Sequence, residues 1–203
     1  MPYKPKEREY RSAAPFTVPD TAPAEGESLI LRGMPIVFDT PTVLFEEDGI
    51  EYKEVIDRRA LDECDMSDFI FNVNHGYADP TVFARNKNGS IKFEITPAGV
   101  PIEVFLDSED ERHRNLYRDI QKRRLDKMSF SFSIREFAYE RETHTRTVLK
   151  IKKLYDVSAV DFAAYNDTSI TTARGFFAEE HAKEFKELEE RRRRQMLIAL
   201  SLT

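Results

Sequence analysis

The chain has 203 residues, of which 40% are hydrophobic and 33% charged, and its formal net charge is −6. These values are typical of a soluble protein with one domain and a highly charged surface. A pI near 5.4 and the lack of any long apolar run argue against nucleic acid and membrane as partners. The N-terminus has no apolar core of a secretory signal, and the single cysteine, Cys64, fits a reducing compartment.

Residues 1–28 are rich in Pro, Ala, Glu and Lys and show no periodicity, which predicts a flexible arm. From residue 29 onward, short apolar runs alternate with turn residues, as is typical of strands. The predicted strands cover residues 29–38, 50–56, 69–74, 82–85, 91–95 and 100–106. Between two of them, Asn88 and Gly89 predict a tight hairpin.

A helix is predicted next, because Ser108 followed three residues later by Glu111 forms a capping box. Leu116, Tyr117 and Ile120 share one face behind this cap, which indicates a core helix over residues 109–125. Further strands are predicted at residues 128–134, 147–154 and 157–160. Many short strands with one inserted helix indicate a mostly β or α+β domain, which we place at residues 29–174.

The last part of the chain differs in texture from the domain. Residues 179–202 have high helix propensity and include four consecutive arginines at 191–194. We expect residues 175–203 to form a helical tail that lies against the domain or a partner, rather than a nucleic-acid-binding segment.

A row of serines lies in the strand predicted at residues 128–134. Ser129, Ser131 and Ser133 alternate with apolar residues, so their hydroxyls share one face and the phenylalanines point to the core. We expect the hydroxyls to face a cleft, although a half-buried strand with a polar outer face would show the same alternation. A serine hydroxyl is a weak nucleophile unless a base lies within hydrogen-bond distance.

Among the four histidines, His75 alone follows an apolar run and precedes a glycine, which places it at the end of a buried strand. His113 lies in the charged helix, His144 in a polar linker and His181 in the tail. A catalytic histidine also needs a group, usually a carboxylate, that fixes its tautomer. Asp156 suits this role because it lies in an otherwise apolar strand, where an unpaired charge is costly. A structural ion pair with an arginine is the alternative.

Metal and phosphate sites have less support. Cys64, Asp65, His75 and Asp79 show no recognised ligand spacing. Seven glycines in the whole chain include no phosphate-binding loop. We therefore predict no metal and no cofactor.

An ordered series of short motifs resembles the prohead (capsid maturation) proteases of tailed bacteriophages, a family related in fold to the herpesvirus assemblin proteases. The resemblance spans about residues 9–174. Residues 73–76 (Val-Asn-His-Gly) match the family's histidine motif, and residues 128–132 (Met-Ser-Phe-Ser-Phe) match its nucleophile motif. The other matching segments are residues 9–12, 31–38, 55–61, 84–91 and 154–160.

The resemblance implies an assemblin-like β-barrel with a few helices, and a serine endopeptidase with His75, Ser129 and Asp156 as catalytic residues. Its substrates would be the scaffolding region of the major capsid protein and the protease itself. The reaction would take place in the host cytoplasm, inside the assembling procapsid. The resemblance is compatible with a homo-oligomer, and the tail would either pair with scaffold helices or be removed by self-cleavage.

The chain departs from the family's pattern at the third catalytic position. The family usually has glutamate where this chain has Asp156, so the shorter side chain must approach His75 more closely. The family also often has glycine at the position of Ser131, and two prolines that are absent from residues 162–166. The main alternative function is a catalytically inactive scaffold or assembly chaperone of the same fold. A metal-dependent hydrolase that uses His75 is a further alternative.

Overall fold

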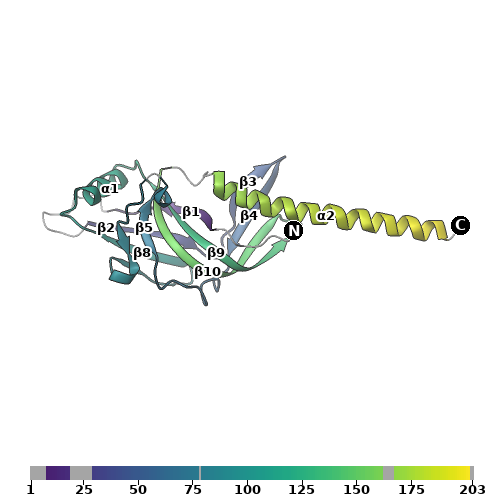
Figure 1. The fold of residues 1–203 in the computed structure, drawn as a ribbon, viewed down its shortest axis with the longest axis horizontal. Coiled ribbons are helices and arrows are strands. Elements are labelled where there is room, and N and C mark those ends of the chain that lie inside the picture. Colours follow the sequence, from purple (N-terminus) through teal and green to yellow (C-terminus); the bar gives the residue numbers. More distant parts are fainter. Residues whose placement is uncertain (1–7, 19–28, 78, 162–166, 202–203) are drawn as a thin grey trace.

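Strands form most of the protein in this computed structural model, which describes residues 8–18, 29–77, 79–161 and 167–201. Within these residues the strands form two sheets, accompanied by two α-helices (Figure 1). The predicted sheet-rich α+β architecture is therefore confirmed. The elements are β1 (Glu9–Pro15), β2 (Leu29–Val37), β3 (Thr42–Glu47), β4 (Ile50–Ile56), β5 (Ile70–Val73), η1 (Asn74–Gly76), β6 (Ala84–Arg85), η2 (Asn86–Asn88), β7 (Ile91–Phe93), β8 (Gly99–Leu106), α1 (Glu111–Gln121), β9 (Lys127–Glu140), β10 (Thr145–Val160) and α2 (Asp167–Ser201).

The larger sheet is built around the long antiparallel hairpin of β9 and β10. β1 pairs with the other edge of β9, and β10 pairs in parallel with β4 and, farther along, with β5. β3 and β6 extend the sheet beyond β4 and β5. Because β5 runs beside residues 156–159 of β10, the residues that follow β5 lie close to this part of β10.

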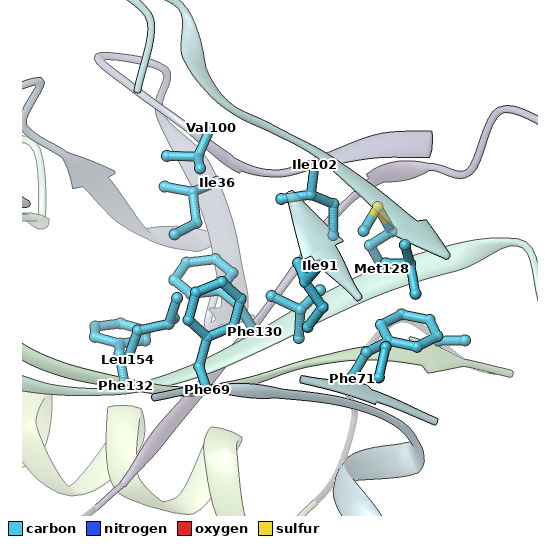
Figure 2. Close-up of a cluster of buried hydrophobic side chains, with 14 of the residues drawn as sticks. Ile36, Phe69, Phe71, Ile91, Val100, Ile102, Met128, Phe130, Phe132 and Leu154 are labelled. Atoms are coloured by element: carbon cyan, nitrogen blue, oxygen red, sulfur yellow. The ribbon is translucent and has the colours of Figure 1, made fainter. Parts of the chain in front are cut away.

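The smaller sheet has the order β2-β8-β7, and the hydrophobic core lies between the two sheets. Apolar side chains of β5, β9 and β10 meet those of β2, β7 and β8 there (Figure 2). The labelled core residues are Ile36, Phe69, Phe71, Ile91, Val100, Ile102, Met128, Phe130, Phe132 and Leu154. The alternation of β9 thus places its phenylalanines in the core, as predicted.

The resemblance predicts a closed barrel, but the pairing among the described strands forms two open sheets. One isolated bridge, between Thr17, two residues after β1, and Arg32 of β2, connects this part of the chain to the smaller sheet. β1 itself lies in the segment predicted to be a flexible arm, yet Glu9–Pro15 is a strand that pairs with β9. The flexible arm was predicted because residues 1–28 lack apolar periodicity. This criterion misses a strand whose buried side chains include charged residues, such as Glu9 and Arg11.

Helix α1 is shorter than predicted, and its cap is a different residue. The carboxylate of Asp110, rather than the Ser108 hydroxyl, accepts a hydrogen bond from the backbone N–H of Arg112, at 2.8 Å. An aspartate two residues closer to the helix makes the same capping contact, so the helix starts later than the serine suggests. Its predicted apolar face is confirmed, since Leu116, Tyr117 and Ile120 are buried.

The predicted hairpin at Asn88 and Gly89 is wrong in its pairing. Gly89 does adopt the left-handed conformation, with φ of 80°, as a turn requires. However, the flanking strands do not pair with each other, because β6 joins β5 in the larger sheet and β7 joins β8 in the smaller one. The turn therefore connects the two sheets.

A separate difference concerns the end of the domain, where the two strands predicted at residues 147–154 and 157–160 form one strand, β10.

Helix α2 extends from the end of the domain well beyond the sheets (Figure 1). Phe176 and Phe177, near its start, are buried against Phe45 of β3 and Tyr52 of β4. Farther along, where the structure describes the side chains of α2, the large hydrophobic residues that are exposed are Phe185, Leu188, Met196, Leu197 and Ile198. Among the described residues, no helix combines the length and apolar character needed to cross a membrane.

Candidate active site

Ser129 lies in the middle of the larger sheet, on β9 between β1 and β10. Its neighbours across the two ladders are Ser12 of β1 and Ser158 of β10. Ser131 and Ser133 share its face, and all three serines are buried, Ser129 completely. The predicted cleft is therefore not open at this row of hydroxyls. β1 lies beside the row, and the Tyr10 side chain lies on the same face because Tyr10 is directly opposite Ser131.

His75 follows β5 in a short segment with unusual backbone conformation. Asn74, His75 and Gly76 all have positive φ, at 46°, 56° and 73°. The backbone N–H of His75 donates to Ser158 Oγ at 3.2 Å, which ties the segment to β10. The ring of Tyr10 packs edge-on to the imidazole, with the ring centroids 4.6 Å apart.

The structure brings the three predicted site residues together. Nε2 of His75 lies 2.7 Å from Oγ of Ser129, and Nδ1 lies 2.6 Å from Oδ1 of Asp156. With Nδ1–H donating to the carboxylate, the lone pair of Nε2 is available to accept the serine proton. We call this hydrogen-bonded set of Ser129, His75 and Asp156 the triad. Its members are separated along the chain by 54 and 81 residues.

The Asp156 carboxylate is buried and has donors on both oxygens. Ser158 Oγ lies 3.0 Å from Oδ1, while Oδ2 accepts hydrogen bonds from Ser131 Oγ, at 2.6 Å, and from Arg8. Burial opposes ionisation of Asp156. Hydrogen bonds from His75 and Ser131, together with the charges of His75 and Arg8, outweigh this cost, so the pKa of Asp156 lies below its ordinary value. The carboxylate therefore stays ionised at neutral pH.

The hydroxyl of Ser129 has a second acceptor. Its Oγ lies 2.9 Å from the backbone carbonyl oxygen of Arg11, in β1. The single hydroxyl proton can be donated either to this carbonyl or to Nε2 of His75. The position of β1 therefore affects whether the Ser129 hydroxyl donates its proton to the Arg11 carbonyl or to His75.

The other three histidines lie away from Ser129. Nδ1 of His113 accepts a hydrogen bond from the backbone N–H of Asp107, at 2.9 Å, before helix α1. His144 and His181 both lie beside the ring of Tyr52, and the centroids of the two imidazole rings are 5.6 Å apart. Within the part of the chain that the structure describes, no group of His, Cys, Asp or Glu side chains is arranged to hold a metal ion.

Cys64 is not part of this site. Burial raises the pKa of its thiol to about 11, so it is protonated at neutral pH and a poor nucleophile.

Several residues of the site were not found from the sequence. Arg8 and Tyr10 stand in the segment predicted to be a flexible arm, and although residues 9–12 match the family, that match assigns no role to Tyr10. Asn72 accepts a hydrogen bond from Ser158, and Ser158 in turn contacts His75 and Asp156. Ser158 could have been found, because it stands two residues after Asp156 and the strand period places both on one face.

A serine, a histidine and a carboxylate joined in this order by hydrogen bonds form the arrangement that serine hydrolases use. A family model described as caudovirus prohead serine protease matches residues 16–184, and the chain belongs to this family. The recognition made from the order of the motifs is thus confirmed, and β1 precedes the matched segment. Membership associates the chain with serine proteolysis and with maturation of the phage capsid. Comparisons with curated proteins and with solved structures each found no match.

Proposed function

We propose that this protein is a serine endopeptidase that cleaves the scaffolding region of the phage major capsid protein, and itself, inside the assembling procapsid. The observation that carries the proposal is the continuous hydrogen-bond chain from Ser129 through His75 to Asp156. Membership in the prohead protease family supplies the reaction class. We also propose that the two sheets are arranged as in the assemblin proteases.

In this mechanism Oγ of Ser129 attacks the carbonyl carbon of the scissile peptide bond, while its proton passes to Nε2 of His75. Asp156 accepts the Nδ1–H hydrogen bond throughout and stabilises the imidazolium. The proton on Nε2 then passes to the leaving amine as the C–N bond breaks, which leaves an acyl ester on Ser129. A water molecule that gives its proton to His75 hydrolyses the ester, and the proton returns to the serine oxygen.

The test combines an active-site probe with the natural substrate. Wild-type protein should become covalently labelled by a fluorophosphonate and should cleave co-expressed capsid protein, whereas Ser129→Ala should do neither. Ser133→Ala is the matched control, because Ser133 lies on the same face of β9 but does not contact His75. Labelling and cleavage that persist in Ser129→Ala would contradict the assignment of the nucleophile.

A catalytically inactive scaffold or assembly chaperone of the same fold is the second candidate. The observation that favours it is the complete burial of Ser129 together with the competing acceptor on Arg11. An inactive protein would show no labelling of Ser129 at any pH, with or without capsid protein. Labelling that appears only in the presence of capsid protein would instead indicate a protease in which substrate binding moves the residues that bury Ser129.

A further inference from the structure

Oδ2 of Asp156, the carboxylate oxygen that does not face His75, is part of a closed set of hydrogen bonds. It accepts from Ser131 Oγ at 2.6 Å and from Nη2 of Arg8. Nε of Arg8 also donates to Ser131 Oγ, at 2.9 Å. The directions are consistent, because the serine gives its one proton to the carboxylate and accepts another from the guanidinium. Each pair among the three groups is therefore hydrogen-bonded.

This arrangement fixes the orientation of the carboxylate. The other oxygen, Oδ1, faces Nδ1 of His75 and the hydroxyl of Ser158. Rotation of the carboxylate would break hydrogen bonds on both oxygens at a site where Asp156 has no exposed surface. Breaking such buried, charge-assisted hydrogen bonds is costly. The direction of the Nδ1–H hydrogen bond, and with it the aim of Nε2 at Ser129, is thereby constrained.

Arg8 is itself held by aromatic side chains. Its guanidinium lies 4.8 Å from the ring centroid of Tyr155 on β10 and 5.8 Å from that of Tyr10 on β1. The side chain is 38% exposed, so Arg8 closes the site at its boundary with solvent. Burial and a hydrogen bond with Tyr77 raise the pKa of Tyr10 above its ordinary value, so this neighbour is uncharged at neutral pH.

We propose that Ser131 and Arg8 are positioning residues that hold Asp156 in register with His75. This inference rests on the proposed function for its effect on catalysis, but its structural content is the orientation of one carboxylate. Ser131 acts as a neutral donor, and Arg8 adds a positive charge that balances Asp156 while His75 is neutral. Around the His75–Asp156 pair, Arg8 binds Asp156 and Tyr10 packs against His75. Behind them, Tyr155 lies against Arg8 and Tyr77 against Tyr10.

Two measurements on the full chain test the proposal. The first is the rate constant for fluorophosphonate labelling of Ser129, measured as a function of pH. The second is the low-field proton NMR signal of the Nδ1–H hydrogen bond of His75, which does not depend on activity. The variants are Ser131→Ala, Arg8→Gln and Arg8→Lys, with Ser133→Ala as the matched control.

We expect Ser131→Ala and Arg8→Gln to slow labelling by on the order of ten- to a hundredfold and to shift or broaden the NMR signal. Ser133→Ala should leave both unchanged, and Arg8→Lys should restore part of the rate because it keeps the charge. Arg8→Gln should also move the acid limb of the labelling profile to higher pH. Without the Arg8 cation, the negative charge of Asp156 favours the protonated form of His75. Nε2 of a protonated His75 cannot accept the serine proton.

Wild-type labelling rates and an unchanged NMR signal in both Ser131→Ala and Arg8→Gln would overturn the inference while leaving the proposed function intact. If the wild type is labelled neither alone nor in the presence of capsid protein, the proposed function fails, and the NMR signal alone decides whether the two residues orient Asp156. If Ser131→Ala does not fold, Arg8→Gln decides the question, because Arg8 is partly exposed and its replacement leaves no cavity in the core.

Discussion

His75 is held in a backbone conformation that residues with a Cβ atom rarely adopt. Three successive residues, Asn74, His75 and Gly76, have positive φ, and the first two carry side chains. The left-handed conformation costs such residues about 1–2 kcal/mol each, so surrounding contacts must maintain it. The hydrogen bond from the His75 backbone to Ser158 and that from Asp161 to the side chain of Asn74, at 3.4 Å, are two of these contacts.

Gly76→Ala tests whether this conformation positions the histidine. An added Cβ would lie 3.6 Å from Nδ2 of Asn72, an ordinary contact, so the change acts through the backbone at φ of 73°. We expect a loss of about 1 kcal/mol in the free energy of unfolding and slower probe labelling of Ser129. Gly49→Ala is the control, because Gly49 has φ of 77° in the β3–β4 turn with no atom within 4 Å of the new Cβ. It should lose similar stability without slowing the labelling, and equal labelling of both variants would contradict the interpretation.

The residues of the triad could be predicted because each stands in a local pattern. His75 follows an apolar run, Ser129 alternates with phenylalanines, and Asp156 interrupts an apolar strand. The ordered motifs of the family then selected these three from their competitors. Arg8 could not be predicted in this way, because its contact with Asp156 joins residues 148 positions apart and its own segment has no periodicity. Such a contact follows from the pairing of β1 with β9, which no local pattern specifies.

At the scale of elements, β1 is fastened to the larger sheet by a buried cluster of four charges. Glu9 and Arg11 of β1 meet Glu54 of β4 and Arg146 of β10, and all four are buried. Burial alone would lower the pKa of Arg11, but the adjacent Glu54 and Glu9 raise it above its ordinary value. Two positive and two negative charges balance, as a buried ionic cluster requires. The Arg146 guanidinium also lies 4.7 Å from the ring centroid of Phe176, so the cluster reaches α2.

Arg146→Met should therefore be strongly destabilising. It leaves two buried carboxylates with one guanidinium, and breaking a buried ionic group in this way costs about 3–5 kcal/mol. Because β1 carries the Arg11 carbonyl and Arg8 directly precedes it, we also expect slower labelling of Ser129 in this variant. Denaturant unfolding followed by circular dichroism gives the stability. Arg58→Met is the matched control, since Arg58 pairs with Asp39 at the surface and should change stability little. Similar losses of stability in the two variants would show that the charge cluster does not hold β1 to the larger sheet.

Element prediction succeeded where an apolar period was strong and failed where pairing decided the outcome. The buried face of α1 followed from its period, but its first turn depended on which of two nearby polar side chains reached the Arg112 amide. The turn at Gly89 was evident, yet its flanking strands belong to different sheets. Strand partners depend on contacts between distant residues, so a hairpin signal alone cannot assign them.

At the scale of the whole molecule, several carboxyl groups among the described residues have lowered pKa values. Side-chain hydrogen bonds lower the pKa at four surface aspartates, and for Asp65 it falls to about 2. Asp156, in the candidate active site, is the buried member of this group. The surface members are Asp65, Asp68, Asp79, Asp110 and Glu187. The acid stability of the protein should therefore report on the surface and on the site together.

The sign of the pH dependence follows from these directions. A carboxyl whose pKa is lower in the folded state than in the unfolded state binds fewer protons when folded. Its stabilisation is fully present above the unfolded value, about 3.9 for aspartate, and is lost as the pH falls through the folded value. We expect the unfolding midpoint to be nearly constant above about pH 5 and to fall steadily toward about pH 2. A midpoint that rises as the pH falls through this window would contradict the assignment.

Salt should weaken the part of the surface contribution that comes from ion pairs. The Debye length is only about 3 Å in 1 M salt, so the ion pairs of the exposed carboxylates are screened, while the hydrogen bonds from Ser67 and Thr81 remain and Asp156 is shielded from solvent by burial. Thermal unfolding from about pH 6 to pH 2 should show a shallower decline in 1 M NaCl than in dilute buffer, with a remainder that Asp156→Asn reduces further. The variant should unfold cooperatively at pH 7 yet label slowly, because an amide cannot stabilise the imidazolium. If Asp156→Asn keeps the high-salt decline unchanged, the ionised carboxylate of the triad does not contribute to acid stability.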